Sequence, residues 1–159
     1  MNGITTCLWF DGNAEEAARF YTSIFPDSRI DKVSKSPADN PSGRAGETLT
    51  VDFTLAGSRF QGLNGGPDFK FNESVSFVID CKDQAEVDRY WDKLVEGGGE
   101  HSVCGWLKDR YGVSWQITPK VLVDMMASPD KARSKRATDA MLKMVKIDVA
   151  ALEAAFDGK

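Results

Sequence analysis

The sequence contains an internal repeat, and this repeat limits the possible folds more than any other feature. Two segments pair a strand-like run with a capped amphipathic helix, and Asn13 and Glu16 of the first correspond to Asp83 and Glu86 of the second, an offset of 70 residues. The apolar helix positions keep the same offset: Ala17, Phe20, Tyr21, Ile24 and Phe25 against Val87, Tyr90, Trp91, Leu94 and Val95. A repeat of this length decides the architecture before local propensities do.

Strand signals surround both helices in the same order. In the first repeat we expect strands at 4–10, 29–35, 48–57 and 59–63, with an exposed loop at 36–46 that is rich in Pro, Gly, Ser and Asn. In the second repeat we expect strands at 73–81, near 100–103, within 104–110 and at 113–118. Each repeat therefore predicts a β-α-β-β-β module.

The remaining segment, 119–159, has helical patterning. Ser128-Pro129-Asp130 predicts a helix start with Pro129 at the first helical position. Asp148 is the expected cap of a last helix, with Ile147 and Leu152 spaced as a hydrophobic staple. The methionines of this segment predict packing either on a sheet of the same chain or on that of a second copy: Met125, Met126, Met141 and Met144.

Composition excludes several classes of function. The net charge of −4 disfavours nucleic-acid binding, which needs a basic face. No apolar run reaches the roughly 20 residues of a membrane span, and the N-terminal residues lack the pattern of a signal peptide. Cys7, Cys81 and Cys104 are an odd, widely spaced set, so we expect mostly buried, reduced thiols in a cytoplasmic protein.

Three stretches of the sequence read WFDGNAEEAARFYTSIFP, GLNGG and DRYGVSWQITP. They resemble the PhnB-like branch of the vicinal oxygen chelate superfamily, a branch often labelled 3-demethylubiquinone-9 3-methyltransferase. The resemblance implies an α+β fold of the glyoxalase/bleomycin resistance/dihydroxybiphenyl dioxygenase type, with two βαβββ modules forming paired open barrels, plus C-terminal helices. We expect this domain at 1–120, with modules 1–66 and 73–119, and a helical extension at 121–159.

The same resemblance implies four positions where metal enzymes of the superfamily carry their ligands. Asp109 and Gly112 match the motif that ends the second module, and the ligand positions hold neutral residues: Thr5, Gln61, Ser76 and Gln116. Hydroxyls and amides do not compensate a divalent transition metal for its lost water, as imidazole, thiolate or carboxylate would. We therefore expect neither a bound metal nor another cofactor.

The resemblance also implies a ligand cavity between the modules, with aromatic walls and a few neutral polar groups. The residues expected to line it are Thr5, Cys7, Trp9, Gln61, Asn64, Ser76, Trp106 and Gln116. Trp115 alternates with Gln116 along one strand, so it is expected in the core. The alternative is that both glutamines are buried and bonded to each other. If the glutamines line the cavity instead, their amides favour a neutral or weakly polar ligand.

Other reactive residues have simpler interpretations. His101, the only histidine, is expected in a surface loop, and without a neighbouring histidine Cys7 is a small apolar residue rather than a nucleophile. Asp80 is a candidate general base, although capping a strand end explains it better. The glycine-rich segment after Gln61 predicts a turn rather than a phosphate cradle, because no helix follows it.

Two classes of function remain. The first is a metal-independent protein that binds a small molecule, in a resistance or sequestration role. The alternative is an enzyme of the same superfamily, either lyase-like or dioxygenase-like, or the methyltransferase of the family label. The open sheet edges of such modules favour a C2 homodimer.

Overall fold

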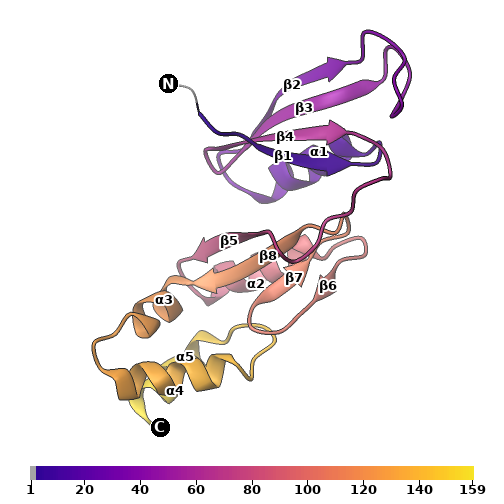
Figure 1. Cartoon of the computed structure of the whole chain (residues 1–159). Coiled ribbons are helices and arrows are strands. Elements are labelled where there is room, and N and C mark those ends of the chain that lie inside the picture. Colours follow the sequence, from indigo (N-terminus) through magenta and orange to yellow (C-terminus); the bar gives the residue numbers. More distant parts are fainter. Residues whose placement is uncertain (1–2) are drawn as a thin grey trace. The chain divides into compact units, whose positions relative to one another are not determined.

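The computed structural model describes residues 3–159. The chain divides into two compact units, with the boundary after Phe71. Each unit holds one open, four-stranded mixed sheet with a helix on one face (Figure 1). Neither sheet closes into a barrel, and the α+β class and the repeated module are confirmed. No helix in the described part of the chain has the length and apolar character needed to cross a bilayer.

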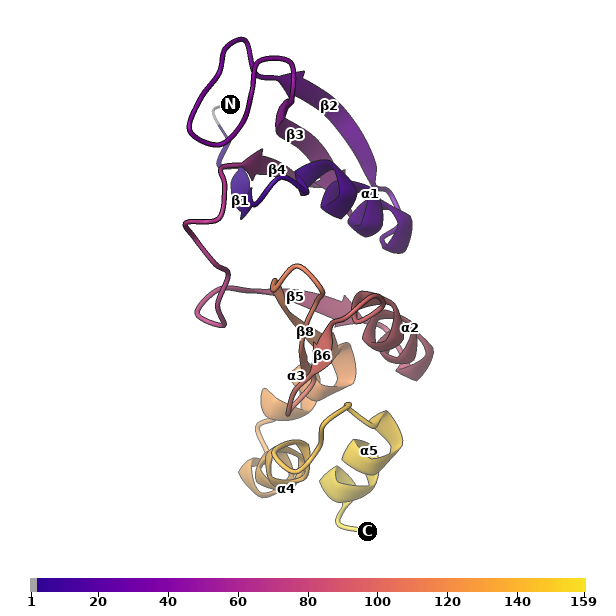
Figure 2. The ribbon, with the colours of Figure 1, turned by 90° about the vertical axis from the view of Figure 1, so that its right-hand side faces the viewer.

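The first unit has the strand order β1-β4-β3-β2, and β1 runs parallel to β4. Its elements are β1 (Thr6–Phe10), α1 (Ala14–Ile24), β2 (Arg29–Lys35), β3 (Thr48–Leu55) and β4 (Ser58–Asn64). Figure 2 shows α1 lying along one face of this sheet. The core is the layer between them, where the side chains of Tyr21 and Phe53 are almost fully buried and stack.

The second unit repeats this order as β5-β8-β7-β6, with β5 parallel to β8. Its elements are β5 (Ser76–Cys81), α2 (Gln84–Leu94), β6 (Glu100–His101), β7 (Trp106–Lys108) and β8 (Ser114–Pro119). The side chains of Val87, Trp91 and Leu94 on α2 are buried, as the repeated apolar stripe predicts. Trp115 is 3% exposed, so its expected place in the core is confirmed.

Three helices follow in the same unit: α3 (Lys120–Met126), α4 (Lys131–Met141) and α5 (Val149–Asp157). They share a small core in which Leu122, Met125 and Leu152 are buried, and Met141 and Met144 pack against it. The segment before α5 is hydrogen-bonded to the loop between β6 and β7: the amides of Cys104 and Gly105 donate to the carbonyls of Met144 and Val145. Met125, Met141 and Met144 therefore pack within their own unit, whereas Met126 is 46% exposed.

The helix caps differ in part from the sequence prediction. Asp83 caps α2 as expected, accepting a bond from the Glu86 amide at 3.0 Å, and Glu86 accepts one from the Lys82 amide. The Lys82 amide lowers the pKa of Glu86. At α1 the expected cap is wrong, because the Asn13 side chain makes no capping bond. Instead Asn64 Oδ1, from β4, accepts the bond from the Ala14 amide at 2.9 Å.

The starts of the last two helices give one correction and one confirmation. Pro129 lies before α4 instead of at its first position, and Asp130 is the capping residue. Asp148 caps α5 by accepting from the Ala151 amide at 2.9 Å. The staple residues Ile147 and Leu152 are both buried, as predicted.

The capping pattern generates a stability prediction. Asp83→Ala should lower the free energy of unfolding by about 0.5–2 kcal/mol, as the loss of a helix cap usually does, whereas Asn13→Ala should change it little. Asn64→Ala should cost roughly 1–3 kcal/mol, because it leaves the buried Ala14 amide without a partner. Urea unfolding followed by circular dichroism measures all three. A loss for Asn13→Ala as large as that for Asp83→Ala would contradict this assignment.

Candidate functional site

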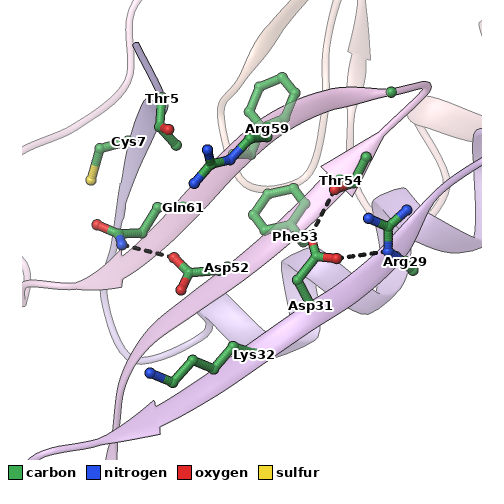
Figure 3. A pocket seen from close by; sticks show the side chains of 12 residues that line it. Thr5, Cys7, Arg29, Asp31, Lys32, Asp52, Phe53, Thr54, Arg59 and Gln61 are labelled. Carbon is green, nitrogen blue, oxygen red and sulfur yellow. Dashed lines mark hydrogen bonds and ion pairs between the residues drawn. The ribbon is translucent and has the colours of Figure 1, made fainter. Parts of the chain in front are cut away.

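A pocket of about 690 Å³ opens on the face of the first sheet that α1 does not cover (Figure 3). Strand alternation creates it, because Leu8, Phe53 and Phe60 point into the core while their neighbours point to the opposite face. The residues lining the pocket are Thr5, Cys7, Arg29, Asp31, Lys32, Asp52, Phe53, Thr54, Gly57, Arg59, Phe60 and Gln61.

The parallel pairing of β1 with β4 brings three expected site residues together here. Cys7 lies directly opposite Gln61 in this register. Thr5 lies two positions before Cys7 and therefore on the same side of the chain. Thr5, Cys7 and Gln61 all line the pocket.

Gln61 is bonded to its own sheet rather than to the other glutamine. Its Nε2 donates to Asp52 Oδ1 on β3 at 2.8 Å, opposite it in the register. Gln116 Nε2 donates to Ser76 Oγ at 2.9 Å. The two amides are thus held separately, each by a polar side chain on a neighbouring strand.

Five charged residues that the sequence did not point to also line the pocket. Arg29 Nε lies 2.7 Å from Asp31 Oδ1, and Thr54 Oγ1 donates to Asp31 Oδ2 at 2.6 Å, so both carboxylate oxygens are engaged. Lys32 and Arg59 form no ion pair or side-chain hydrogen bond with any residue between 3 and 159. Strand alternation is the signal that was available, since Arg59 precedes Gln61 by two positions.

Trp9 and Asn64, two other expected site residues, have structural contacts. Trp9 Nε1 donates to the Gly66 carbonyl at 2.8 Å, and its ring packs edge-on against Phe69. A Cβ at Gly65 would lie 2.2 Å from the Trp9 ring, so this position needs glycine. Asn64 caps α1 and donates to the Thr48 carbonyl at 2.8 Å.

The turn predicted for the glycine-rich segment lies further along the chain: Gly62 is within β4, Gly65 and Gly66 directly follow the strand, and the turn is formed by Pro67 and Asp68. The amides of Gly65 and Gly66 both donate to the Phe10 carbonyl, at 2.9 and 3.3 Å. They are therefore used within the fold and do not point toward a free anion site.

The second sheet carries the remaining expected residues on its uncovered face. Ser76 and Gln116 are joined by the hydrogen bond described above, and Trp106 lies opposite Gln116 in the β7–β8 register. Trp106 lines a pocket of about 530 Å³ together with Cys104 and Ser114. The Ser114 Oγ is buried and has no hydrogen-bond partner among the described residues.

The cysteines are all free, but the expectation that most are buried is wrong. Only Cys81 is buried, whereas Cys7 is exposed and Cys104 is intermediate. Burial, with nearby carboxylates, raises the pKa of Cys81 to about 12. Partial desolvation also raises the pKa of the Cys7 thiol, which works against a thiolate nucleophile at neutral pH.

His101 and Asp80 lie apart from the first pocket. His101 is exposed on β6, where its ring stacks on Trp91 with centroids 4.3 Å apart. Asp80 is exposed on β5. Within residues 3–159, no group of three or more His, Cys, Asp or Glu residues is arranged to hold a metal ion.

Asp109, from the motif at the end of the second module, organises a turn. It is 3% exposed and accepts bonds from the Tyr111 and Val113 amides through Oδ1, and from Trp115 Nε1 through Oδ2 at 2.8 Å. Gly112 completes this turn with a φ of +89°, a conformation that favours glycine. Asp109 and Gly112 therefore fix the start of β8 and its Gln116.

Comparison with known proteins gives one family and several solved folds. The family model described as 3-demethylubiquinone-9 3-methyltransferase matches residues 2–118. A PhnB protein from Bacillus cereus, described under the same methyltransferase name, is 35% identical, and the match covers 74% of this chain and 99% of that one with a TM-score of 0.66. No curated protein matches the sequence.

More distant structures share the fold alone. A Pseudomonas aeruginosa protein is 18% identical, with a TM-score of 0.61 over 75% of this chain and 98% of its own. The fosfomycin resistance protein FosX from Mesorhizobium loti is 15% identical, with a TM-score of 0.54 over 80% of this chain and 99% of its own.

The chemistry of the four ligand positions generates a prediction about metal. We expect purified protein to hold zinc, nickel, manganese and iron at far below one ion per chain, because Thr5, Gln61, Ser76 and Gln116 offer only neutral oxygen and nitrogen donors. Mass spectrometry of tag-free, dialysed protein measures this content. About one tightly held ion per chain would contradict the prediction.

Proposed function

Because this chain belongs to the 3-demethylubiquinone-9 3-methyltransferase family of the vicinal oxygen chelate superfamily, we propose that it uses this fold to bind a small molecule without a metal. The ligand lies on the uncovered face of the first sheet. The observation that supports this most is the pocket that gathers Thr5, Cys7 and Gln61. Its volume of about 690 Å³ falls within the range common for small-molecule sites.

Binding is better supported than methyl transfer. Common enzymes that use S-adenosylmethionine hold the cofactor on a parallel, doubly wound sheet, at a glycine-rich turn that leads into a helix. Each sheet here has one parallel pair and two antiparallel pairs. The glycines that follow β4, Gly65 and Gly66, donate their amides to the Phe10 carbonyl, and the chain continues without a helix to β5.

The uncovered face of the second sheet is included in the proposal as a second ligand surface. Ser76 and Gln116 offer a hydroxyl and an amide, and Trp106 offers an aromatic ring.

A substitution at Gln61 tests the binding site. Gln61→Leu should weaken binding of small polar fragments, observed as amide shifts of Cys7 and Thr54 in ¹⁵N-labelled protein. The melting temperature of the Gln61→Leu variant should fall by only a few degrees. Asp52 is partly exposed, so water replaces the hydrogen bond that it accepts from Gln61. Thr6→Val, next to Cys7 but pointing away from the pocket, is the control. Unchanged fragment affinity in Gln61→Leu would place the site elsewhere.

We also propose that the protein is a homodimer in which a second copy covers apolar positions that the chain leaves exposed. Val75 is 66% exposed, and Val78 lies on the uncovered face of an edge strand. Exposed strands and apolar patches of this kind are features that a partner subunit commonly covers.

Sedimentation velocity at tens of micromolar protein tests the assembly. We expect a single species with the mass of two chains, and Val78→Lys should shift it toward the monomer. Lys143→Glu, an exposed position between α4 and α5, is the control substitution. A wild-type protein that sediments only as a monomer would contradict the proposal.

A further inference from the structure

The pocket of the first sheet is positively charged in a chain that is acidic overall. It is lined by three cations, Arg29, Lys32 and Arg59, and by two carboxylates, Asp31 and Asp52, which sums to +1 against −4 for the whole chain. We propose that this pocket binds an oxyanion, a carboxylate, phosphate or phosphonate group of a small molecule, through Arg59 and Lys32. This inference rests on the proposed function and adds the chemical class of the ligand.

The hydrogen bonds within the pocket leave its cations, rather than its anions, available. Both oxygens of Asp31 are engaged, one by Arg29 and one by Thr54. Asp52 Oδ1 accepts from Gln61. The pocket thus satisfies much of its own acceptor capacity, while Lys32 and Arg59 keep their donors free of any described residue.

The pairing of β3 with β4 fixes the position of Arg59 in the pocket. Arg59 lies directly opposite Thr54 in the β3–β4 register, and Gln61 follows two positions later on the same face. Figure 3 shows the guanidinium of Arg59 directed across the sheet toward β1, where Thr5 and Cys7 lie. A guanidinium offers two parallel N–H groups that match the two oxygens of a carboxylate or phosphate.

The neutral groups around Arg59 suit the same ligand. The Thr5 hydroxyl can donate a hydrogen bond to an anion. Cys7 adds no negative charge at neutral pH, because partial desolvation raises the pKa of its thiol. The prediction from the sequence favoured a neutral or weakly polar ligand because it did not include the cations of β2 and β4. With these cations in the pocket, we expect a charged ligand instead.

Titration of ¹⁵N-labelled protein with inorganic phosphate, methylphosphonate and acetate at low ionic strength tests the proposal. Glycerol serves as the neutral probe. We expect saturable amide shifts concentrated at Cys7, Thr54, Arg59 and Gln61 for at least one of the anions. Arg59→Gln should weaken that binding about tenfold, which is the loss of one charge-assisted contact. Arg59→Lys should restore part of it, because the charge remains without the planar fork.

Two charge-matched variants of the same unit are controls. Arg44→Gln and Lys70→Gln remove one positive charge each from exposed positions that do not line this pocket. They should change the affinity for the anion by less than about twofold relative to the wild-type protein, because exposed charges far from a site are largely screened. Spectra of all variants should keep the wild-type shifts outside the substituted region, since each replaced side chain is exposed.

The outcomes separate the two proposals. If neutral fragments shift the pocket amides and no anion does, the ligand is neutral, so this inference fails and the binding function stands. It also fails if Arg59→Gln weakens anion binding no more than the controls, or if the anions shift amides over the whole surface equally. If neither anions nor neutral fragments shift the pocket amides, the proposed binding function fails together with the inference.

Discussion

The parallel pairing of the first and last strands of each module is the constraint on which the rest of the structure depends. Parallel neighbours need a long connection, and here it runs through a helix and two further strands. The helix covers one face of the sheet, so its apolar stripe and the inward residues of the strands form the core there. The other face stays open, and the pairing brings Cys7 next to Gln61 on it.

The two modules use this scaffold for different surfaces. Gln61 and Gln116 occupy equivalent positions on the last strands, opposite Cys7 and Val78. In the first module the glutamine donates to a carboxylate, Asp52, among arginines and a lysine, whereas in the second it donates to Ser76 beside Trp106. Gln61 therefore lies among charged side chains, whereas the immediate neighbours of Gln116 are a hydroxyl and an aromatic ring. The topology is shared, but β2 has seven residues and its counterpart β6 has two, so the difference lies both in the outward residues and in the length of the strand that carries Arg29 and Lys32.

Much of the fold could be predicted from the sequence, because the apolar periodicity of a strand or helix is set by which face is buried. The strand at 29–35 and the helix after Asp83 agree with the structure. The cap of α1 could not be predicted, because it comes from Asn64 on a distant strand. In the site, the resemblance singled out Gln61, which lines the pocket of the first sheet, and its role in binding a ligand stays a prediction. Arg59 could have been found by strand alternation from Gln61, whereas Lys32 joins this face only through the register of β2 with β3, which the sequence does not show.

Local contacts, rather than the charge of the whole protein, must govern any anion held on the first sheet. The net charge of −4 repels anions at long range, but the Debye length is only about 8 Å at physiological ionic strength. An anion in the pocket is therefore influenced mainly by Arg59, Lys32 and the engaged carboxylates. These cations are exposed, so each loses little hydration on binding and contributes modestly. Selectivity must then come from the geometry of the donors around the pocket and from the shape of the rest of the ligand.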